Sequence, residues 1–265
     1  MKPSILFSSA GRRGRLLRNA QESIGSKCDI NATDNNATAP ALYFATNEYV
    51  VPRINDPEYV DTVLDICKKA NVKAITTLID PEIEILSANR EKFLEAGVLP
   101  LCPADEITAR CCFDKYEMFK YLTEKGIPTP LTYHDFDDFK KGIDEGKISF
   151  PIFMKPICGS GSVGAHKVNT MEQAETDWFS GEHDYIIQEL MIGGDCDADV
   201  YVDAISHKAV AAFLKRKIET RIGGASKTIS YKDPMLLRRL LQYSNFAVLL
   251  IWTSSLKMVS IIYQK

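Results

Sequence analysis

The chain has 265 residues, of which 45% are hydrophobic and 25% are charged, and its formal net charge is −3. A chain of this length and apolar content can bury a sizeable core in two domains. The near-neutral charge argues against a nucleic-acid-binding protein, and the short arginine cluster between residues 12 and 18 does not change this.

The cysteine content and the short apolar runs indicate the cellular compartment that we expect for the protein. Seven cysteines are present, none in a C-x-x-C pair, which argues against a disulfide framework or a zinc site. We therefore expect reduced thiols in a cytoplasmic protein. The apolar run 5–7 is too short for a signal peptide, and the run 246–252 is too short to span a bilayer. No membrane partner is expected.

Strands and helices alternate along the first hundred residues. The pattern predicts one helix that starts near Arg13 and two further helices at 57–71 and 82–96. The predicted strands are 5–7, 28–33, 49–51 and 72–78. Such alternation predicts βαβ units around a parallel sheet, which is a Rossmann-like domain.

From Pro103 onward the pattern changes to α+β. Helices are predicted at 105–112 and 115–125, and the second is stopped by Gly126 and Pro128. The predicted extended segments are 150–154, 166–168 and 185–188, followed by a hairpin of 199–204 and 209–214. No internal repeat is present.

A glycine-rich segment carries the strongest chemical signal. Lys155 ends an apolar strand, and residues 159–164 (Gly-Ser-Gly-Ser-Val-Gly) hold three glycines and two serines. The backbone N–H groups of such a loop can surround phosphate oxygens, and the lysine adds positive charge. No Gly-Lys-Ser/Thr follows, so the loop is not a P-loop. The alternative is a plain hairpin turn.

Features at fixed distances strengthen the phosphate interpretation. Lys115 opens a helix about forty residues before Lys155, although an exposed helical lysine is usually only a solvated side chain. After the loop, Gln188 and Glu189 end a strand, and apolar residues and Asp195 follow. This order suits an adenine pocket and a ribose-binding acid.

The motifs together resemble the ATP-grasp superfamily. Their order is Asp-Lys, Gly-Ile-Pro-Thr-Pro, Phe-Pro-Ile-Phe-Met-Lys-Pro, Gly-Ser-Gly-Ser-Val-Gly and Gln-Glu, and it looks closest to the carbamoyl-phosphate-synthase large-chain-like members. The resemblance implies an α/β fold in which a Rossmann-like pre-ATP-grasp domain precedes an α+β ATP-grasp domain that is incomplete at the C-terminus. The implied parts are that domain at 1–102, a helical linker at 103–127, a lid subdomain at 128–188, a partial C-terminal subdomain at 189–242 and an aberrant tail at 243–265.

The resemblance also implies roles for single residues. Lys115 and Lys155 would bind the nucleotide phosphates beneath the flexible loop of Gly159, Ser160, Gly161, Ser162, Val163 and Gly164. The adenine would lie against Gln188, Glu189, Leu190, Met191 and Ile192. Asp195 would take the ribose, with Asp197 as second choice.

Further residues are implied on the substrate side. Lys215, Arg216 and Arg221 stand where such enzymes hold phosphates or an acyl phosphate, and the alternative is an exposed basic hairpin. Residues 9–13 could touch an acceptor substrate, and the alternative is a structural βα turn. The implied chemistry joins a small carboxylate to an amine or thiol through an acyl phosphate, with ATP and Mg²⁺ as cofactors. A homodimer is compatible with the resemblance.

The family's late acidic ligands for Mg²⁺ are absent, because no Asp or Glu follows Asp233. The genetic code permits an explanation. Residues 247–264, read two nucleotides out of frame, can encode an acid-rich string of the expected kind, in which an Asp spanning Trp252 and Thr253 is forced by any codon choice. The hypothesis is a frameshift near 242–246, with poor packing of the tail and weak or absent catalysis.

Two functions therefore stay open: an ATP-dependent ligase, and a nucleotide-binding protein without ligase activity because the metal ligands are missing. A Rossmann oxidoreductase is disfavoured. The first turn, Gly11-Arg12-Arg13-Gly14, lacks the G-x-G-x-x-G pattern, and its arginines crowd the pyrophosphate position.

Overall fold

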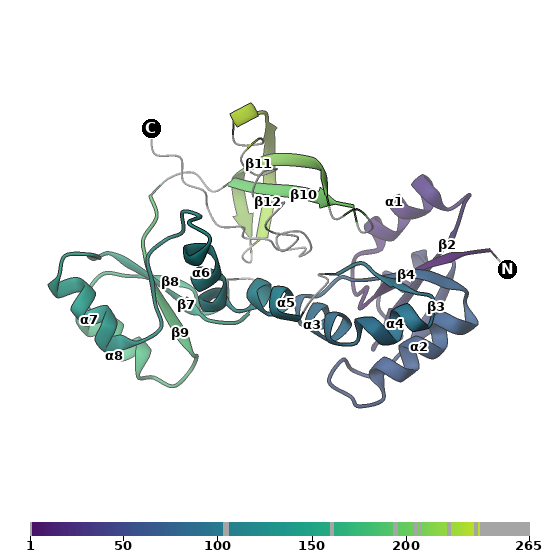
Figure 1. Ribbon diagram of the computed structural model, residues 1–265, viewed down its shortest axis with the longest axis horizontal. Coiled ribbons are helices and arrows are strands. Elements are labelled where there is room, and N and C mark those ends of the chain that lie inside the picture. Colours follow the sequence, from purple (N-terminus) through teal and green to yellow (C-terminus); the bar gives the residue numbers. More distant parts are fainter. Residues whose placement is uncertain are drawn as a thin grey trace. The chain divides into compact units, whose positions relative to one another are not determined.

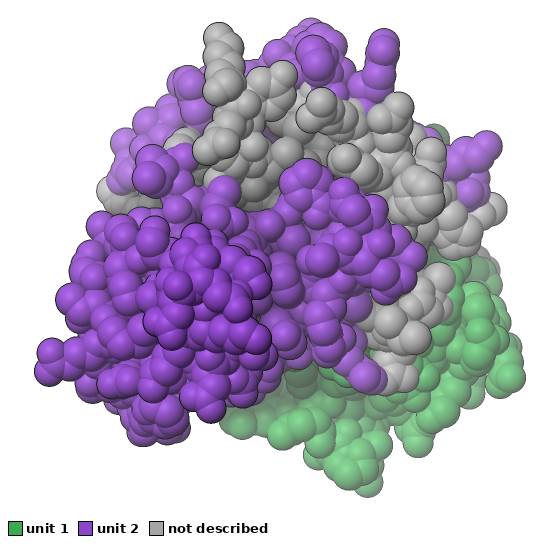
Figure 2. All heavy atoms as spheres, turned by 60° about the vertical axis from the view of Figure 1, so that its left-hand side comes forward, with its two compact units in different colours: residues 1–109, 252–254 green, residues 110–251, 255–265 purple. Residues whose placement is uncertain are grey.

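The structure is a computed structural model, and it describes residues 2–102, 106–159, 162–192, 196–203, 206, 208–221, 224–235 and 238. Contacts within the chain divide these residues into two compact units, the first ending at Ala109 and the second beginning at Arg110. Figure 2 shows the two units in separate colours. The predicted tail after residue 242 lies outside the described residues.

The first unit is built on a five-stranded parallel sheet (Figure 1). Its strands are β1 (Ser4–Ser8), β2 (Asp29–Asp34), β3 (Asn47–Val50), β4 (Val72–Thr77) and β5 (Leu99–Pro100). They lie in the order β3-β2-β1-β4-β5, and each neighbouring pair is parallel. The chain winds outward from β1 in both directions, as in a Rossmann fold. The predicted parallel sheet is confirmed, with β5 as an additional edge strand.

Helices cover both faces of this sheet. They are α1 (Gly14–Ile24), the 3₁₀ helix η1 (Leu42–Phe44), α2 (Tyr59–Lys69), α3 (Asp80–Ala88) and α4 (Arg90–Glu95). Leu6 and Ile75 point to the core formed with α2, α3 and α4. Phe7 and Ile30 point to the core formed with α1 and η1. Successive strand residues thus serve opposite faces, and both cores are closed.

One predicted helix is divided in two. The apolar pattern over 82–96 predicted a single helix, but α3 ends and α4 begins around Asn89, whose φ is −104° and ψ is 16°. The Asn89 side-chain amide donates to the carbonyl of Ile85 at 2.9 Å. A side chain that bonds its own backbone competes with the helical pattern, which explains the break.

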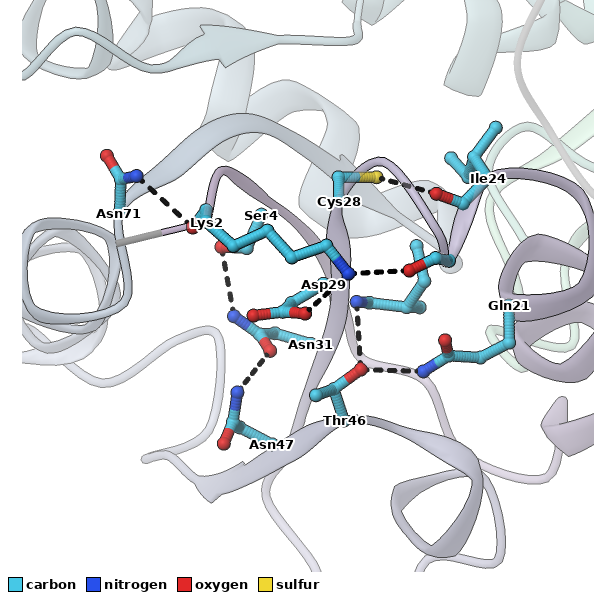
Figure 3. Close-up of polar contacts among 12 residues, drawn as sticks. Lys2, Ser4, Gln21, Ile24, Cys28, Asp29, Asn31, Thr46, Asn47 and Asn71 are labelled. Carbon is cyan, nitrogen blue, oxygen red and sulfur yellow. Dashed lines mark hydrogen bonds and ion pairs between the residues drawn. The ribbon is translucent and has the colours of Figure 1, made fainter.

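Polar side chains link the strands of the first unit at the edge where the strands begin (Figure 3). Asn31 of β2 is fully buried; its amide nitrogen donates to Ser4 Oγ at 3.0 Å. Its amide oxygen accepts from Asn47 of β3 at 2.9 Å. Ser4 Oγ in turn donates to the carbonyl of Ala70 at 2.8 Å. These bonds satisfy buried polar groups across neighbouring strands and so hold their register.

The second unit begins with helices α5 (Glu106–Phe113) and α6 (Lys115–Glu124), followed by a four-stranded sheet in the order β6-β9-β7-β8. The strands are β6 (Thr132–Tyr133), β7 (Ile152–Pro156), β8 (His166–Val168) and β9 (Tyr185–Glu189), and all pairs are antiparallel. Helices α7 (Phe136–Asp144) and α8 (Met171–Trp178) pack on one face of it.

This four-stranded sheet has its own core. Phe136 and Phe139 of α7 pack with Ala174 of α8 against Ile152 and Met154 of β7. Both amphipathic helices went unnoticed in the sequence because they are short and lie between turns. Asp135 and Thr170 cap them, with side chains that accept from backbone N–H groups.

A three-stranded antiparallel sheet follows in the order β10-β11-β12. Its strands are β10 (Cys196–Val202), β11 (Ala209–Arg221) and β12 (Gly224–Tyr231). The predicted hairpin of 199–204 and 209–214 is present, but β11 extends to Arg221 and β12 was not predicted. The extension of β11 was not predicted because charged residues follow one another in 215–221, so no apolar period marks a strand there. Among the described residues no helix is long and apolar enough to cross a membrane.

The buried Asn31 bonds yield the first prediction. Replacing Asn31 by Ala removes the partner of the buried Ser4 hydroxyl on β1 and of the Asn47 amide on β3, so the free energy of unfolding should fall by about 2 kcal/mol. Urea denaturation measures this. The control is Asn35→Ala at an exposed position, where a change within about 0.5 kcal/mol is expected. Equal effects in the two variants would contradict a structural role for the Asn31 bonds.

Candidate functional site

The β1–α1 turn of the first unit is held in an unusual conformation. Ser9 has a φ of +48° and Gly11 a φ of +54°, so the chain enters the left-handed region twice. The N–H of Gly11 donates to Asp34 Oδ2 at 2.7 Å, and Ala10 N–H donates to the carbonyl of Thr33 at 3.0 Å. The turn is therefore fastened to the end of β2. A non-glycine residue at positive φ is costly and persists only where neighbours enforce it.

A buried carboxylate supplies that enforcement for Ser9. Glu82 of α3 has no exposed surface. Its Oε2 accepts from the hydroxyls of Ser9 and Thr77 at 2.6 Å each, and its Oε1 accepts from Ser8 and Tyr59. Four hydroxyl donors thus converge on one carboxylate. They lie where β1 and β4 end, the point from which the strand order diverges and where open α/β sheets usually bind ligands.

The charges around this turn are visible in two pKa shifts. Burial, followed by the negative charge of Glu82 and its hydrogen bond, raises the pKa of the Tyr59 hydroxyl far above its usual range. Burial and the neighbouring Arg12 lower the pKa of Arg13, and Asp80 opposes them. The β1–α1 turn thus combines a cationic surface with an acidic interior.

The glycine loop connects β7 to β8 in the second unit. Gly159 has a φ of +120°, Ser162 of +60° and Gly164 of +71°, and Ser160 and Gly161 lie outside the described residues. A Cβ at Gly164 would stand 2.7 Å from His183 and 2.9 Å from Pro156, and the positive φ there also favours glycine. Among the described residues, a Cβ at Gly159 would meet nothing within 4 Å, so none of them covers that side of Gly159. Val163 is 70% exposed.

Lys115 lies directly against the start of this loop. Its Nζ donates to the carbonyl oxygens of Ile157 and Gly159 at 3.1 Å each, and its backbone N–H donates to Ile157 at 3.0 Å. The preceding Asp114 caps helix α6 by accepting from the N–H groups of Tyr116 and Glu117. The structure thus brings together Lys115 and the loop that the sequence singled out separately. Lys155 is half-buried on β7, two residues before Ile157.

The predicted adenine segment ends β9. Gln188 is buried, and its amide donates to Thr132 Oγ1 at 2.6 Å, which gives it a structural role in this structure. Glu189 Oε1 accepts from the N–H of Leu131 at 2.9 Å, and the Glu189 N–H donates to the carbonyl of Leu131 at 3.0 Å. Beyond Leu190 the chain becomes exposed, with Met191 at 37% and Ile192 at 87%.

The residues predicted for ribose and acyl phosphate are partly described. Asp195 lies outside the described residues, and of Arg221 only the backbone is described. Asp197 Oδ1 lies 3.0 Å from Lys217 Nζ, and both side chains are largely buried. Lys215 lies 2.6 Å from Asp199, and Arg216 is exposed. Asp197 and Lys215 thus each have an ion-pair partner within the β10–β11 hairpin.

Sequence reasoning missed two features of these sites. One is Glu82. In the sequence a proline and an acid follow a β-branched strand, but this pattern does not distinguish a buried carboxylate from an exposed one. The other is His166, whose ring contacts the glycine loop. Among the described residues no group of His, Cys, Asp and Glu side chains could hold a metal ion. The segment after Asp233, where the resemblance places the magnesium ligands, lies mostly outside those residues.

The convergence of hydroxyls on Glu82 predicts a large cost for its removal. Glu82→Ala leaves four buried donors without their acceptor, and the free energy of unfolding should fall by about 3 kcal/mol or more. The matched control is Glu91→Ala, at an exposed site on α4, where a change within about 0.5 kcal/mol is expected. Denaturant unfolding of both variants decides. A small loss for Glu82→Ala would remove the carboxylate as the anchor of the turn.

The raised pKa of Tyr59 predicts loss of stability in alkali. The neutral hydroxyl is favoured in the folded chain, so its contribution is complete below the ordinary tyrosine pKa of about 10 and is lost as pH rises above it. Tyr59→Phe should therefore flatten the fall in unfolding free energy between about pH 10 and pH 11.5. Tyr43→Phe, at a residue that is 74% exposed, is the control. Parallel pH profiles for wild type and Tyr59→Phe would contradict the prediction.

Comparison with known proteins connects these sites to a fold. Residues 5–101 match the family described as PylC-like, N-terminal domain. Over 241 residues the chain is 25% identical to the formate-dependent phosphoribosylglycinamide formyltransferase of Alcanivorax borkumensis. The matched region covers 86% of this chain and 56% of that protein. The chain therefore spans about half the length of the curated relatives it matches.

Solved structures extend the likeness to the second unit. The biotin carboxylase domain of Hydrogenobacter thermophilus 2-oxoglutarate carboxylase, determined with Mg-ADP, ADP and bicarbonate, superposes with a TM-score of 0.69 at 15% identity, over 93% of this chain and 57% of that one. The N5-carboxyaminoimidazole synthetase of Staphylococcus aureus, complexed with ADP, gives a TM-score of 0.67 at 15% identity, over 91% and 62%. The fold class predicted from the sequence is confirmed: this chain has the fold of the ATP-grasp superfamily, with a front domain that matches the PylC-like N-terminal domain.

Proposed function

We propose that this chain binds ATP in its second unit, and that its lineage chemistry is the ATP-dependent joining of a carboxylate to an amine or thiol through an acyl phosphate. Two independent lines support this. One is the order and spacing of five short motifs, and the other is a fold shared with proteins whose structures contain ADP. Because the chain spans only part of its relatives, the activity of a whole enzyme is part of the proposal.

One observation supports the proposal above all others: the contact of Lys115 with the glycine loop. The ammonium group of Lys115 donates to the carbonyls of Ile157 and Gly159. It therefore lies next to the side of Gly159 that none of the described residues covers. Phosphate oxygens that entered there would meet the lysine charge and the loop N–H groups together. A plain hairpin turn does not require an ammonium group from a helix forty residues earlier.

Each residue then has a task. Lys115 and Lys155 would neutralise the phosphates, and the loop would cover them. Bound ATP would supply the phosphoryl group that activates the carboxylate. The strand end at Glu189, with Leu190, Met191 and Ile192, would line the adenine, and the partial exposure of Met191 and high exposure of Ile192 suit residues that a base would cover. Asp195 would bind the ribose, because Asp197 already pairs with Lys217.

The acceptor side is proposed for the first unit. The turn at residues 9–13 carries two arginines over a rigid base made by Glu82 and Asp34, which suits an anionic group on a substrate. On the hairpin, Lys215 and Arg216 would hold phosphate or acyl-phosphate oxygens in the complete protein. The finer grouping with carbamoyl-phosphate-synthase-like proteins is part of this proposal and is supported by the motif order alone.

A second candidate is a nucleotide-binding protein without ligase activity. It is favoured by one feature of the sequence, the absence of any Asp or Glu after Asp233. Magnesium requires oxygen ligands, and residues 234–265 offer no carboxylate side chain to such a site. Binding through lysines and backbone N–H groups does not depend on those ligands.

The two candidates are separated by assaying this chain with ATP, with and without Mg²⁺. Release of phosphate that depends on Mg²⁺ and rises with an amino-acid or other carboxylate substrate supports the ligase. Thermal stabilisation by ATP without phosphate release supports the binding protein. If millimolar ATP causes no thermal stabilisation and no phosphate release, both candidates are refuted.

Lys155 tests the phosphate site directly. Lys155→Ala should weaken ATP binding by roughly 1.5–3 kcal/mol, the usual value of a charge-assisted contact. Lys167→Ala, an exposed lysine on β8 of the same sheet, is the matched control and should leave affinity within about twofold. Isothermal titration calorimetry gives both values. Equal affinities for the two variants would remove Lys155 from the site.

A further inference from the structure

His166 joins the end of the glycine loop to helix α8. It is the first residue of β8, and its Nδ1 lies 3.0 Å from the carbonyl oxygen of Gly164. Its Nε2 lies 2.9 Å from Oδ2 of Asp177 on α8. The His166 and Asp177 side chains are 35% and 29% exposed, so both are sheltered without being sealed from solvent.

Both partners of this imidazole are hydrogen-bond acceptors. A backbone carbonyl can only accept, and so can an ionised carboxylate. A neutral imidazole carries a single N–H, so it can donate to Gly164 or to Asp177 but not to both. Only the doubly protonated imidazolium makes both bonds at once.

We propose that His166, in its doubly protonated form, is a positioning residue that fixes the C-terminal end of the glycine loop. The inference rests on the proposed function, in which this loop covers the phosphates of ATP. Protonated, His166 ties the Gly164 carbonyl to the rigid helix α8. When the proton leaves, one of the two bonds is lost, and the loop end is released from the helix.

The rest of the loop makes this tie effective. Its first end is held by Lys115 through the carbonyl of Gly159. At the second end, Gly164 is confined by His183 and Pro156 and has a φ of +71°. The left-handed backbone and these two neighbours limit the conformations of the peptide at Gly164. Because Gly159 and Gly164 are both held, these described ends of the loop have less conformational entropy to lose when a ligand binds.

The surroundings of His166 identify Asp177 as the carboxylate that acts on it. On β9, the ring of Tyr185 meets the imidazole edge-on at 6.1 Å. Burial, then Glu182 and Asp177, raise the pKa of Tyr185, so this hydroxyl stays neutral across the physiological range. The ring of His183 also contacts the Tyr185 ring edge-on, with 5.4 Å between the ring centroids. His183 is itself titratable and must be separated from His166 by mutation.

The sharpest test is a substitution that changes the acceptor into a donor. In Asp177→Asn, the side-chain amide can donate to Nε2 while Nδ1–H donates to Gly164, so the neutral imidazole satisfies both contacts. The pH dependence should then disappear. His166→Phe keeps a ring against Tyr185 but has no donor at any pH. Asp137→Asn, on the exposed side of α7, is the control and should behave as wild type.

Three measurements between pH 6 and pH 8.5 test the proposal: the nitrogen NMR shifts of His166, the hydrogen-exchange protection of amides 162–165, and the dissociation constant of ATP. Wild type should show a doubly protonated ring and a protected loop at pH 6, and should lose both as pH rises. Its ATP affinity should fall about fivefold relative to that of Asp177→Asn, the factor that one hydrogen bond of ~1 kcal/mol represents. Comparison with this variant cancels the titration of ATP itself.

The outcomes separate the two proposals. If ATP does not bind but the NMR and exchange results hold, the proposed function fails and the tie at His166 stands. If ATP binds and wild type and Asp177→Asn share one pH profile, the tie is refuted and the proposed function stands. A His166 ring with a single N–H at pH 6 would also overturn the inference. His183→Gln should leave the wild-type pH dependence in place, and loss of that dependence would assign it to His183 instead.

Discussion

The contact between Lys115 and the carbonyls of Ile157 and Gly159 is the constraint on which the second unit depends. It joins a helix N-terminus to the exit of strand β7, and it places a positive charge where the chain turns into the glycine loop. The backbone bond from Lys115 N–H to Ile157 repeats the same link without a charge. Because both bonds start from one residue, the capped start of α6 and the loop are positioned together. The ammonium group of Lys115 therefore lies at the start of the loop.

The first unit solves a comparable problem with a buried acid. Glu82 lies where a parallel sheet usually leaves a crevice, and its two oxygens are engaged by four hydroxyls from β1, β4 and α2. An ionised carboxylate without such partners would be very costly to bury. With them, it holds Ser9 at positive φ and gives the arginine-bearing turn a firm base. The hydrogen bonds to the buried Glu82 therefore offset the conformational strain of Ser9 in the turn.

Charge is arranged differently on the β10–β11 hairpin. Lys217 pairs with Asp197 in a largely buried place, and Lys215 pairs with Asp199 nearer the surface. A buried pair contributes little net stability, since desolvation offsets the attraction, but losing one partner is costly. The pairs keep this face of the strands close to neutral. A phosphate approaching Lys215 would therefore compete with Asp199, which already forms an ion pair with it.

The sequence by itself determined the fold class and the locations of the main motifs. Alternating apolar strands and helices specify a parallel sheet, because each strand must bury both faces, and glycines at 159, 161 and 164 mark a loop whatever surrounds it. The tertiary structure decided what distant side chains do. Burial of Glu82, the meeting of Lys115 with Gly159, and the two acceptors of His166 join residues far apart in the chain or on different elements. Local periodicity reports which face of an element is apolar, but hydrogen-bond partners are chosen only when the elements pack.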